Sequence, residues 1–184
     1  AKSQVGAIES FEALPALHKK KEYRELNEKE LMLRKNYQAL GAFDSKDRSE
    51  AVDLLGVATQ LIFPTSPNVW LEDLEHRDDM EFLYETASAT NKSQIAFCNQ
   101  DPRLLSVAYI PLADLKEAEN AAKEALDLGA KALLIPWACP KNHSTSHVEL
   151  DKVWAQAQEA GVPVLFHVGV ADKVLPKAHK NNGL

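Results

Sequence analysis

The sequence predicts an α/β fold in which helices cover a parallel sheet. Four apolar runs lack the alternation of polar and apolar residues that a half-exposed strand shows. Segments with helical periodicity separate these runs, and this order is typical of a parallel sheet covered by helices. The expected strands are Ala58–Phe63, Leu104–Ile110, Lys131–Ile135 and Val162–Val168.

Two architectures fit this order of elements, an open doubly wound sheet and a (β/α) barrel. No G-x-G-x-x-G motif follows any of the four runs, which disfavours the dinucleotide-binding form of the doubly wound sheet. The 184 residues are 45% hydrophobic, so one domain with a sizeable core is expected. No low-complexity segment or linker divides the chain.

The first part of the chain is expected to be a helical excursion or a lid over a site. His18–Gln38 is highly charged, and its leucines form only a weak apolar face, which favours a solvated helix. Ser45–Gly56 has the pattern of a capped helix that leads into the first strand. We therefore expect a single domain over residues 1–184, with the excursion or lid in 1–44 and the βα units in 45–184.

Three further helices are expected between the strands. The first spans roughly Asp78 to Phe97. The second begins with Asp114 as N-cap and Glu117 three residues later, and its apolar residues keep to one face. Ser146 and Glu149 form a similar capping pair before the third.

A proline repeat locates the ends of the strands. Three of the four runs end in an apolar residue followed by proline, at Pro64, Pro111 and Pro136. Proline lacks the N–H that a ladder needs, so each marks the point where strand pairing stops. In the fourth run, His167 takes the place of the proline. This alignment predicts that His167 lies at the C-terminal edge of the sheet, where α/β barrels carry their active sites.

Three residues at this edge are candidates for function. His167 is either a core or rim histidine or, as a neutral imidazole, a ligand for zinc or a similar divalent ion. Trp137 directly follows Pro136, so it either packs on a neighbouring helix or forms a wall of a substrate pocket. Thr65 follows Pro64 in the same way and is the weaker candidate for substrate binding.

Other reactive residue types are expected to have structural roles. His143 and His147 are four residues apart, but the proline, asparagine and serine residues around them predict a loop rather than a helix with a zinc pair. Cys98 and Cys139 have no nearby base in the sequence and are expected to be inert thiols. Asp101–Arg103 lies in the turn before a strand, at the end of a barrel where residues serve stability.

The charge balance and the cysteine content limit the partners and the compartment. Lysine and arginine number 21 and aspartate and glutamate 27, so the net charge of -6 argues against nucleic acid or an anionic membrane surface as partner. No apolar run approaches the ~20 residues of a spanning helix. Two distant cysteines without paired spacing predict a reducing, cytoplasmic compartment.

A resemblance to a known family covers most of the chain from about Leu40 to Gly169. It is carried by LGAFDSKDRSEAVDLLGVATQLIFPT, FCNQDPRLLSVAYIPLADLKEAENAAKEALDLGAKALLIP and LDKVWAQAQEAGVPVLFHVG. These segments resemble the amidohydrolase-related enzymes (amidohydrolase 2) typified by aminocarboxymuconate-semialdehyde decarboxylase and the resorcylate decarboxylases. The resemblance implies a (β/α)8 TIM barrel, of which this chain covers about strands 2 to 5 with their helices.

The resemblance also implies one divalent metal, expected to be zinc, at the C-terminal ends of the strands. The family has a metal-binding histidine on strand five, in a His-x-Gly pattern that His167 and Gly169 match. The family's His-x-His or acidic-x-His pair on the first strand has no counterpart here. Its later histidine and aspartate would follow strand five, where this sequence ends. We therefore expect a fragment of a barrel, in which the catalytic acid or base remains unidentified.

The resemblance implies a metal-dependent enzyme that acts on a small carboxylate-bearing substrate. Decarboxylation is favoured over hydrolysis of a lactone or an amide, and a homodimer is expected. The alternative is an inactive barrel fragment that acts only as an oligomerising or binding module, because one histidine cannot hold a catalytic zinc that usually has three protein ligands.

Overall fold

A computed structural model describes residues 13–34 and 36–167 of the chain. The chain divides into two compact units. The first comprises residues up to Gln60 together with Phe97–Leu104, and the second comprises Leu61–Ala96 together with the residues from Leu105 on.

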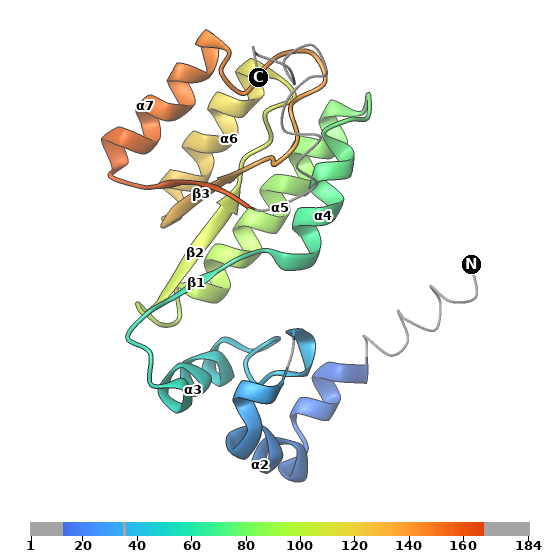
Figure 1. The fold of residues 1–184 in the computed structure, drawn as a ribbon, viewed down its shortest axis with the longest axis vertical. Coiled ribbons are helices and arrows are strands. Elements are labelled where there is room, and N and C mark those ends of the chain that lie inside the picture. The colour runs from blue at the N-terminus through green and yellow to red at the C-terminus, as the bar shows by residue number, and fades with distance from the viewer. Residues whose placement is uncertain (1–12, 35, 168–184) are drawn as a thin grey trace, which may run out of the picture. The chain divides into compact units, whose positions relative to one another are not determined.

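Helices and strands alternate along the second half of the chain (Figure 1). The α-helices are α2 (Lys21–Glu30), α3 (Ser45–Leu55), α4 (Thr65–Leu74), α5 (Met80–Cys98), α6 (Leu115–Asp127) and α7 (Asp151–Ala160). The strands are β1 (Gln60–Ile62), β2 (Leu104–Tyr109), β3 (Ala132–Ile135) and β4 (Val164–Phe166). Short 3-10 turns are η1 (Leu31–Leu33), η2 (Asn36–Gln38) and η3 (Val148–Leu150).

The four strands form one sheet in the order β1-β2-β3-β4. β2 pairs with β3 and β3 with β4 in parallel, with Val107 opposite Ala132 and Leu134 opposite Leu165. The predicted α/β class with a parallel sheet is confirmed. An order that follows the chain without reversal is that of successive barrel strands, whereas a doubly wound sheet reverses its order at a switch point.

The central strands β2 and β3 are buried on both faces, which explains why they lack polar alternation. One face packs against α6 and α7, and the other packs against α4 and the first half of α5 (Figure 1). On the first face the strand residues are Ala108, Ile110, Leu133 and Ile135, packed with Ala118, Ala122, Val153 and Ala157. On the second they are Val107, Tyr109, Ala132 and Leu134, packed with Leu71, Leu74, Leu83 and Ala87.

Helix α4 is the one α-helix of residues 45–167 that was not expected from the sequence. Its first residues, Thr65 to Pro67, have the composition of a turn. Proline is nevertheless tolerated in the first turn of a helix, because the N–H that it lacks has no partner within the helix there. The helix therefore begins directly after Pro64, which is its N-cap residue.

The expected cap of α6 is confirmed, the cap of α3 is a residue that the sequence analysis did not name, and the expected cap of α7 differs. Asp44 accepts from the amides of Lys46 and Asp47 at the start of α3, and Asp114 likewise caps α6. The expected Ser146–Glu149 pair is wrong. The chain enters α7 through the η3 turn, so the cap position falls on His147, whose Nδ1 accepts from the Glu149 amide at 3.3 Å.

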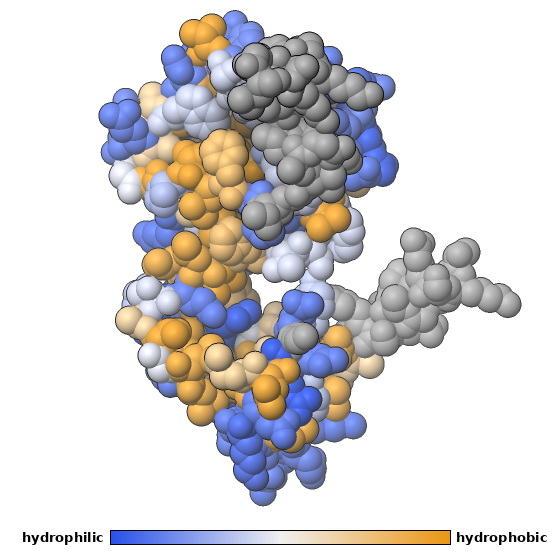
Figure 2. Space-filling model, in the orientation of Figure 1, coloured by the Kyte–Doolittle hydropathy of each residue, from blue (hydrophilic) through white to orange (hydrophobic). Residues whose placement is uncertain are grey.

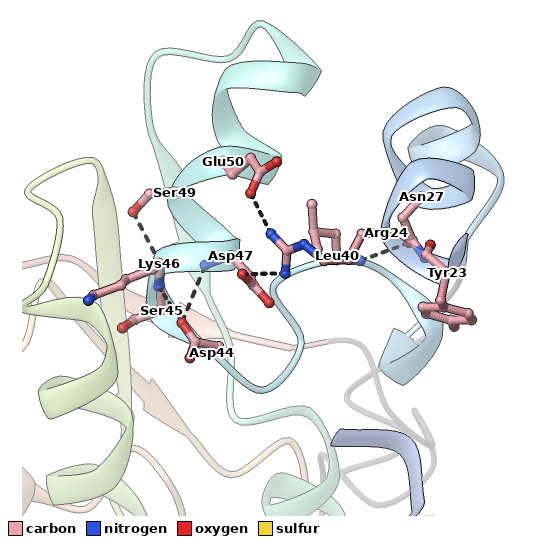
Figure 3. Close-up of polar contacts among 10 residues, drawn as sticks. All are labelled: Tyr23, Arg24, Asn27, Leu40, Asp44, Ser45, Lys46, Asp47, Ser49 and Glu50. Atoms are coloured by element: carbon pink, nitrogen blue, oxygen red, sulfur yellow. Dashed lines mark hydrogen bonds and ion pairs between the residues drawn. The ribbon is translucent and has the colours of Figure 1, made fainter. Parts of the chain in front are cut away.

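The first unit is held together by polar contacts between α2 and the segments around α3 (Figure 3). Arg24 pairs with Asp47 and with Glu50, each at 2.8 Å. The buried Asn27 accepts from the Leu40 amide at 3.0 Å. The helical expectation for His18–Gln38 is confirmed for Lys21–Glu30, and the charges of this segment are partly used to join α2 to α3. Its role as a lid stays a prediction.

Hydrophobic side chains also reach the surface of each unit (Figure 2). Large examples are Met32, Leu33, Trp70, Val148 and Phe166. Among the helices of the described residues, none combines the length and the apolarity that crossing a membrane requires.

Candidate functional site

Three side chains from different strand ends meet at the C-terminal edge of the sheet. His167 directly follows β4, and its ring centroid lies 5.8 Å from that of Phe63, which follows β1. The Trp137 ring, two residues beyond β3, lies 6.3 Å from the His167 ring. His167 is exposed, so it is a rim residue and not a core histidine. The proline repeat thus placed His167 and Trp137 at the correct edge.

Thr65 lies beside this group in the chain. It is the first residue of α4, its side chain is exposed, and its amide donates to the Phe63 carbonyl at 2.9 Å. The tight turn that results carries the chain from β1 into α4. The substrate-binding roles of Thr65 and Trp137 stay predictions.

Glu72 of α4 is a buried carboxylate bound to the backbone that carries Trp137. Its side chain is 5% exposed, and Oε1 accepts from the Trp137 amide at 2.6 Å. Burial raises the pKa of Glu72 to about 7, against the opposing effect of the amides of Trp137 and Ala138 that bind it. A carboxyl group that can gain or lose a proton near neutral pH therefore lies directly behind the Trp137 segment.

Glu75, the residue after α4, is a second buried carboxylate. It is fully buried, and Oε1 accepts from the Leu112 amide at 2.9 Å and lies 3.4 Å from the Tyr109 hydroxyl. Burial raises its pKa to about 8, and the neighbouring charge of Glu72 acts in the same direction. Glu75 thus holds the segment after β2 as Glu72 holds the segment after β3.

His76 adds a third link between the end of α4 and the segment after β3. Its Nδ1 lies 3.1 Å from the Glu72 carbonyl and its Nε2 lies 3.2 Å from the Cys139 carbonyl. Both partners are backbone carbonyl oxygens, which accept hydrogen bonds. The ring thus joins α4 to the backbone around Cys139.

Sequence reasoning missed the acidic residues of α4. Asn68, Leu71, Glu72 and Glu75 are spaced i, i+3, i+4 and i+7 and are all buried, as on the inner face of an amphipathic helix. The spacing could have indicated one face of a helix. It could not indicate burial, because glutamate is almost never fully buried unless it is paired.

Two of the features expected to be structural, the Asp101–Arg103 turn and Cys98, have surroundings that fit this expectation. Arg103 Nε donates to Asp101 at 3.1 Å, and its guanidinium also pairs with Asp53 of α3. Burial raises the pKa of the Cys98 thiol to about 11, which suppresses the reactive thiolate at neutral pH.

Residues 13–34 and 36–167 contain no group of three or more His, Cys, Asp or Glu side chains placed to hold a metal ion. The rings of His143 and His147 lie 5.5 Å apart in the loop after β3, but Nδ1 of His147 is occupied by the Glu149 amide. His167 suits a metal as one neutral nitrogen donor, and the described residues supply no complete set of ligands with it.

Comparison with known proteins places this fold beside the amidohydrolases. The chain is similar to the crystal structure of the amidohydrolase map2389c from Mycobacterium avium subsp. paratuberculosis K-10, with a TM-score of 0.56 and 25% sequence identity. The match covers 72% of this chain and 36% of that one, so the chain spans about a third of the length of the structure that it matches. No family model and no curated protein matches the sequence. The structural match supports an amidohydrolase-related family for this chain.

Proposed function

We propose that this chain is part of an amidohydrolase-related enzyme that acts on a small carboxylate-bearing substrate at the C-terminal edge of the sheet. The observation that carries the proposal is the meeting of Phe63, Trp137 and His167 from three strand ends. Barrel enzymes assemble their active sites at this edge from several strands. The similarity to a solved amidohydrolase supports the reaction class.

The proposal includes a divalent metal, zinc in the first instance, with His167 as one ligand. The donor chemistry of His167 fits, while the remaining ligands must come from outside the described residues. A bound metal would supply a Lewis acid that polarises a substrate oxygen. The chain's own residues position it: Phe63 and Trp137 flank the imidazole, and Glu72 fixes the backbone of Trp137.

Decarboxylation is proposed ahead of hydrolysis of a lactone or an amide, on the family resemblance of the sequence alone. The proposal places the enzyme in the cytoplasm as a homodimer. A panel of small aromatic and unsaturated carboxylates, incubated with zinc-loaded protein, separates the two reactions. Release of CO₂ supports the decarboxylase, ring or amide opening without CO₂ supports the hydrolase, and no turnover of either kind contradicts an enzymatic role.

The metal-binding role of His167 is tested by substitution. We expect His167→Ala to lower the zinc content of purified protein at least about tenfold, because loss of one ligand removes much of the binding energy. The measurement is elemental analysis after dialysis against a weak chelator. The matched control is His147→Asn. It removes an imidazole from the loop after β3, and asparagine can still act as the N-cap of the η3 turn. Equal zinc content in wild type and His167→Ala would refute the ligand role.

A further inference from the structure

Three buried oxygens on one face of α4 and its end have no hydrogen-bond partner within residues 13–34 and 36–167. They are Asn68 Oδ1, Glu72 Oε2 and Glu75 Oε2. Each side chain is at least 95% buried, since the exposed fractions are 5%, 5% and 0%. A buried carboxylate with an unpartnered oxygen is costly when it is ionised, and two of them side by side also repel each other. The full ionisation of both carboxyl groups is therefore disfavoured by their surroundings.

The Tyr109 hydroxyl links the two carboxyl groups. It lies 3.4 Å from Glu75 Oε1, and it is also close enough to Glu72 to act on the charge of that carboxyl group. A hydroxyl has one proton to donate and two lone pairs to accept. It can therefore bridge two carboxyl groups with two hydrogen bonds only if one of the carboxyl groups brings a proton of its own. A single proton on the pair therefore suits this arrangement better than two ionised carboxyl groups do.

We propose that Glu72 and Glu75 hold a single proton between them through Tyr109, and that this proton keeps the Trp137 segment in place against α4. Glu75 is the more deeply buried group and carries the proton, whereas Glu72 carries the charge that the amides of Trp137 and Ala138 stabilise. Loss of the proton leaves two adjacent buried charges. The repulsion then drives the end of α4 away from the segments after β2 and β3, and Trp137 with them from His167.

The groups that face the pair agree with this assignment. They come from the end of α4, from α5 and from β2, and they are His76, Tyr84 and Tyr109. His76 favours the charge on Glu72, and burial raises the pKa of Tyr84 and Tyr109, so that both stay neutral and hydroxyl-bearing. This inference concerns the positioning of Trp137 and holds whichever reaction the enzyme catalyses.

The experiment follows the proton and the tryptophan in the same samples. The carboxyl carbons of Glu72 and Glu75 are observed by NMR in the intact chain between pH 5.5 and 9, together with the amide of Trp137. We expect one proton to leave the pair within this range, and the Trp137 amide to shift with the same midpoint. The contact between the Trp137 and His167 rings, seen as a nuclear Overhauser effect, should be lost above that midpoint. Two carboxyl groups that are both ionised at pH 5.5 would overturn the proposal, as would a ring contact that persists at pH 9.

Variants separate this pair from other titrating groups. Glu72→Gln should abolish the shift of the Trp137 amide, and Glu75→Gln should move its midpoint down by at least about one pH unit, because the neighbouring charge is removed. Tyr109→Phe removes the hydroxyl between the carboxyl groups of Glu72 and Glu75, so the two groups should no longer titrate together. Glu81→Gln, which changes an exposed carboxylate on α5, is the control and should leave the midpoint unchanged. An unchanged transition in Glu72→Gln would overturn the assignment, and the wild-type carboxyl titration decides the question if a variant does not fold.

Discussion

Glu75 shows how a single residue can be tolerated in the core and still make stability depend on pH. Its Oε1 accepts from the Leu112 amide and lies 3.4 Å from the Tyr109 hydroxyl, while its Oε2 is buried and has no partner among the described residues. The hydrogen bonds offset only part of the cost of removing the charge from water. The protonated form is therefore the one that suits the folded protein.

This environment predicts that the protein loses stability as the pH rises. The pKa of Glu75 is raised from its usual 4.5 to about 8, so between these values the folded state binds more protons than the unfolded state. The stabilising contribution is complete below pH 4.5 and is lost as the pH rises through about 8. Glu75→Gln should therefore be more stable than wild type at pH 8.5, by roughly 1–3 kcal/mol, and should differ little at pH 5.5.

Urea unfolding at the two pH values measures this difference. Glu81→Gln serves as the control, because the carboxylate of Glu81 is exposed. The interpretation fails if Glu75→Gln loses stability between pH 5.5 and 8.5 as steeply as wild type does.

Asn91 of α5 is a second residue whose role could not be seen in the sequence, because it depends on the contact of α5 with β2. Its side-chain amide donates to the Tyr109 carbonyl and accepts from the Tyr109 amide, each at 2.8 Å. It thereby supplies to the backbone of β2 the pair of hydrogen bonds that a neighbouring strand would make. Asn91→Ala would leave both backbone groups buried and unpaired.

We expect Asn91→Ala to lower the free energy of unfolding by about 2–4 kcal/mol, from two unsatisfied groups at about 1–3 kcal/mol each less some relaxation. Asn120→Ala on the exposed face of α6 should change it by less than about 0.5 kcal/mol. Chemical denaturation of the three proteins gives the comparison. A similar small loss in both variants would show that water replaces the Asn91 amide.

Only the part of the site that depends on local sequence patterns could be predicted from the sequence. The proline repeat marks strand ends, and it placed His167 and Trp137 at one edge. The contact between Phe63 and His167 joins residues more than a hundred positions apart and has no local signature. The burial of Glu72 and Glu75 depends on which face of the sheet α4 covers, and a helix rich in acidic residues gives no sign of this.

At the scale of elements, side-chain caps explain why some helices could be predicted from the sequence and α4 could not. Asp114 stands one residue before α6 and accepts from the amides of Lys116 and Glu117 at 2.8 and 2.9 Å, so the sequence pattern and the structure agree. In α4 the N-cap is Pro64, which offers no side-chain acceptor, and the helix lacks a start signal. Its stability comes instead from Leu71 and Leu74 against the sheet.

The caps of α6 and α7 provide a matched pair of variants. Asp114→Ala should cost about 1 kcal/mol, because it leaves two amides of the first turn without their acceptor. Ser146→Ala should cost less than about 0.5 kcal/mol, since the Ser146 hydroxyl bonds only to Ser144 Oγ on the surface, at 2.8 Å. Thermal unfolding followed by circular dichroism measures both. Equal losses would restore Ser146 as the cap that the sequence pattern indicated.

At the scale of the whole molecule, the outer strands of the sheet raise the question of what covers them. β1 and β4 are the outer strands of the four, and each carries an exposed hydrophobic residue, Leu61 at 43% and Phe166 at 67%. A closed barrel has no such edges, and an exposed apolar edge strand favours pairing with another chain. The homodimer expected from the sequence would bury part of this surface.

We therefore predict that light scattering of the purified 184-residue chain gives a mass about twice the 20.4 kDa of the sequence, and that the value falls on dilution as weak interfaces dissociate. Phe166→Lys should shift the equilibrium towards the monomer, because a charge at the edge must be desolvated to pair. Val148→Lys is the control, since Val148 is 72% exposed but belongs to the η3 turn and not to a strand. A monomeric wild type at all concentrations would contradict the dimer, and an equal response of both variants would place the interface away from β4.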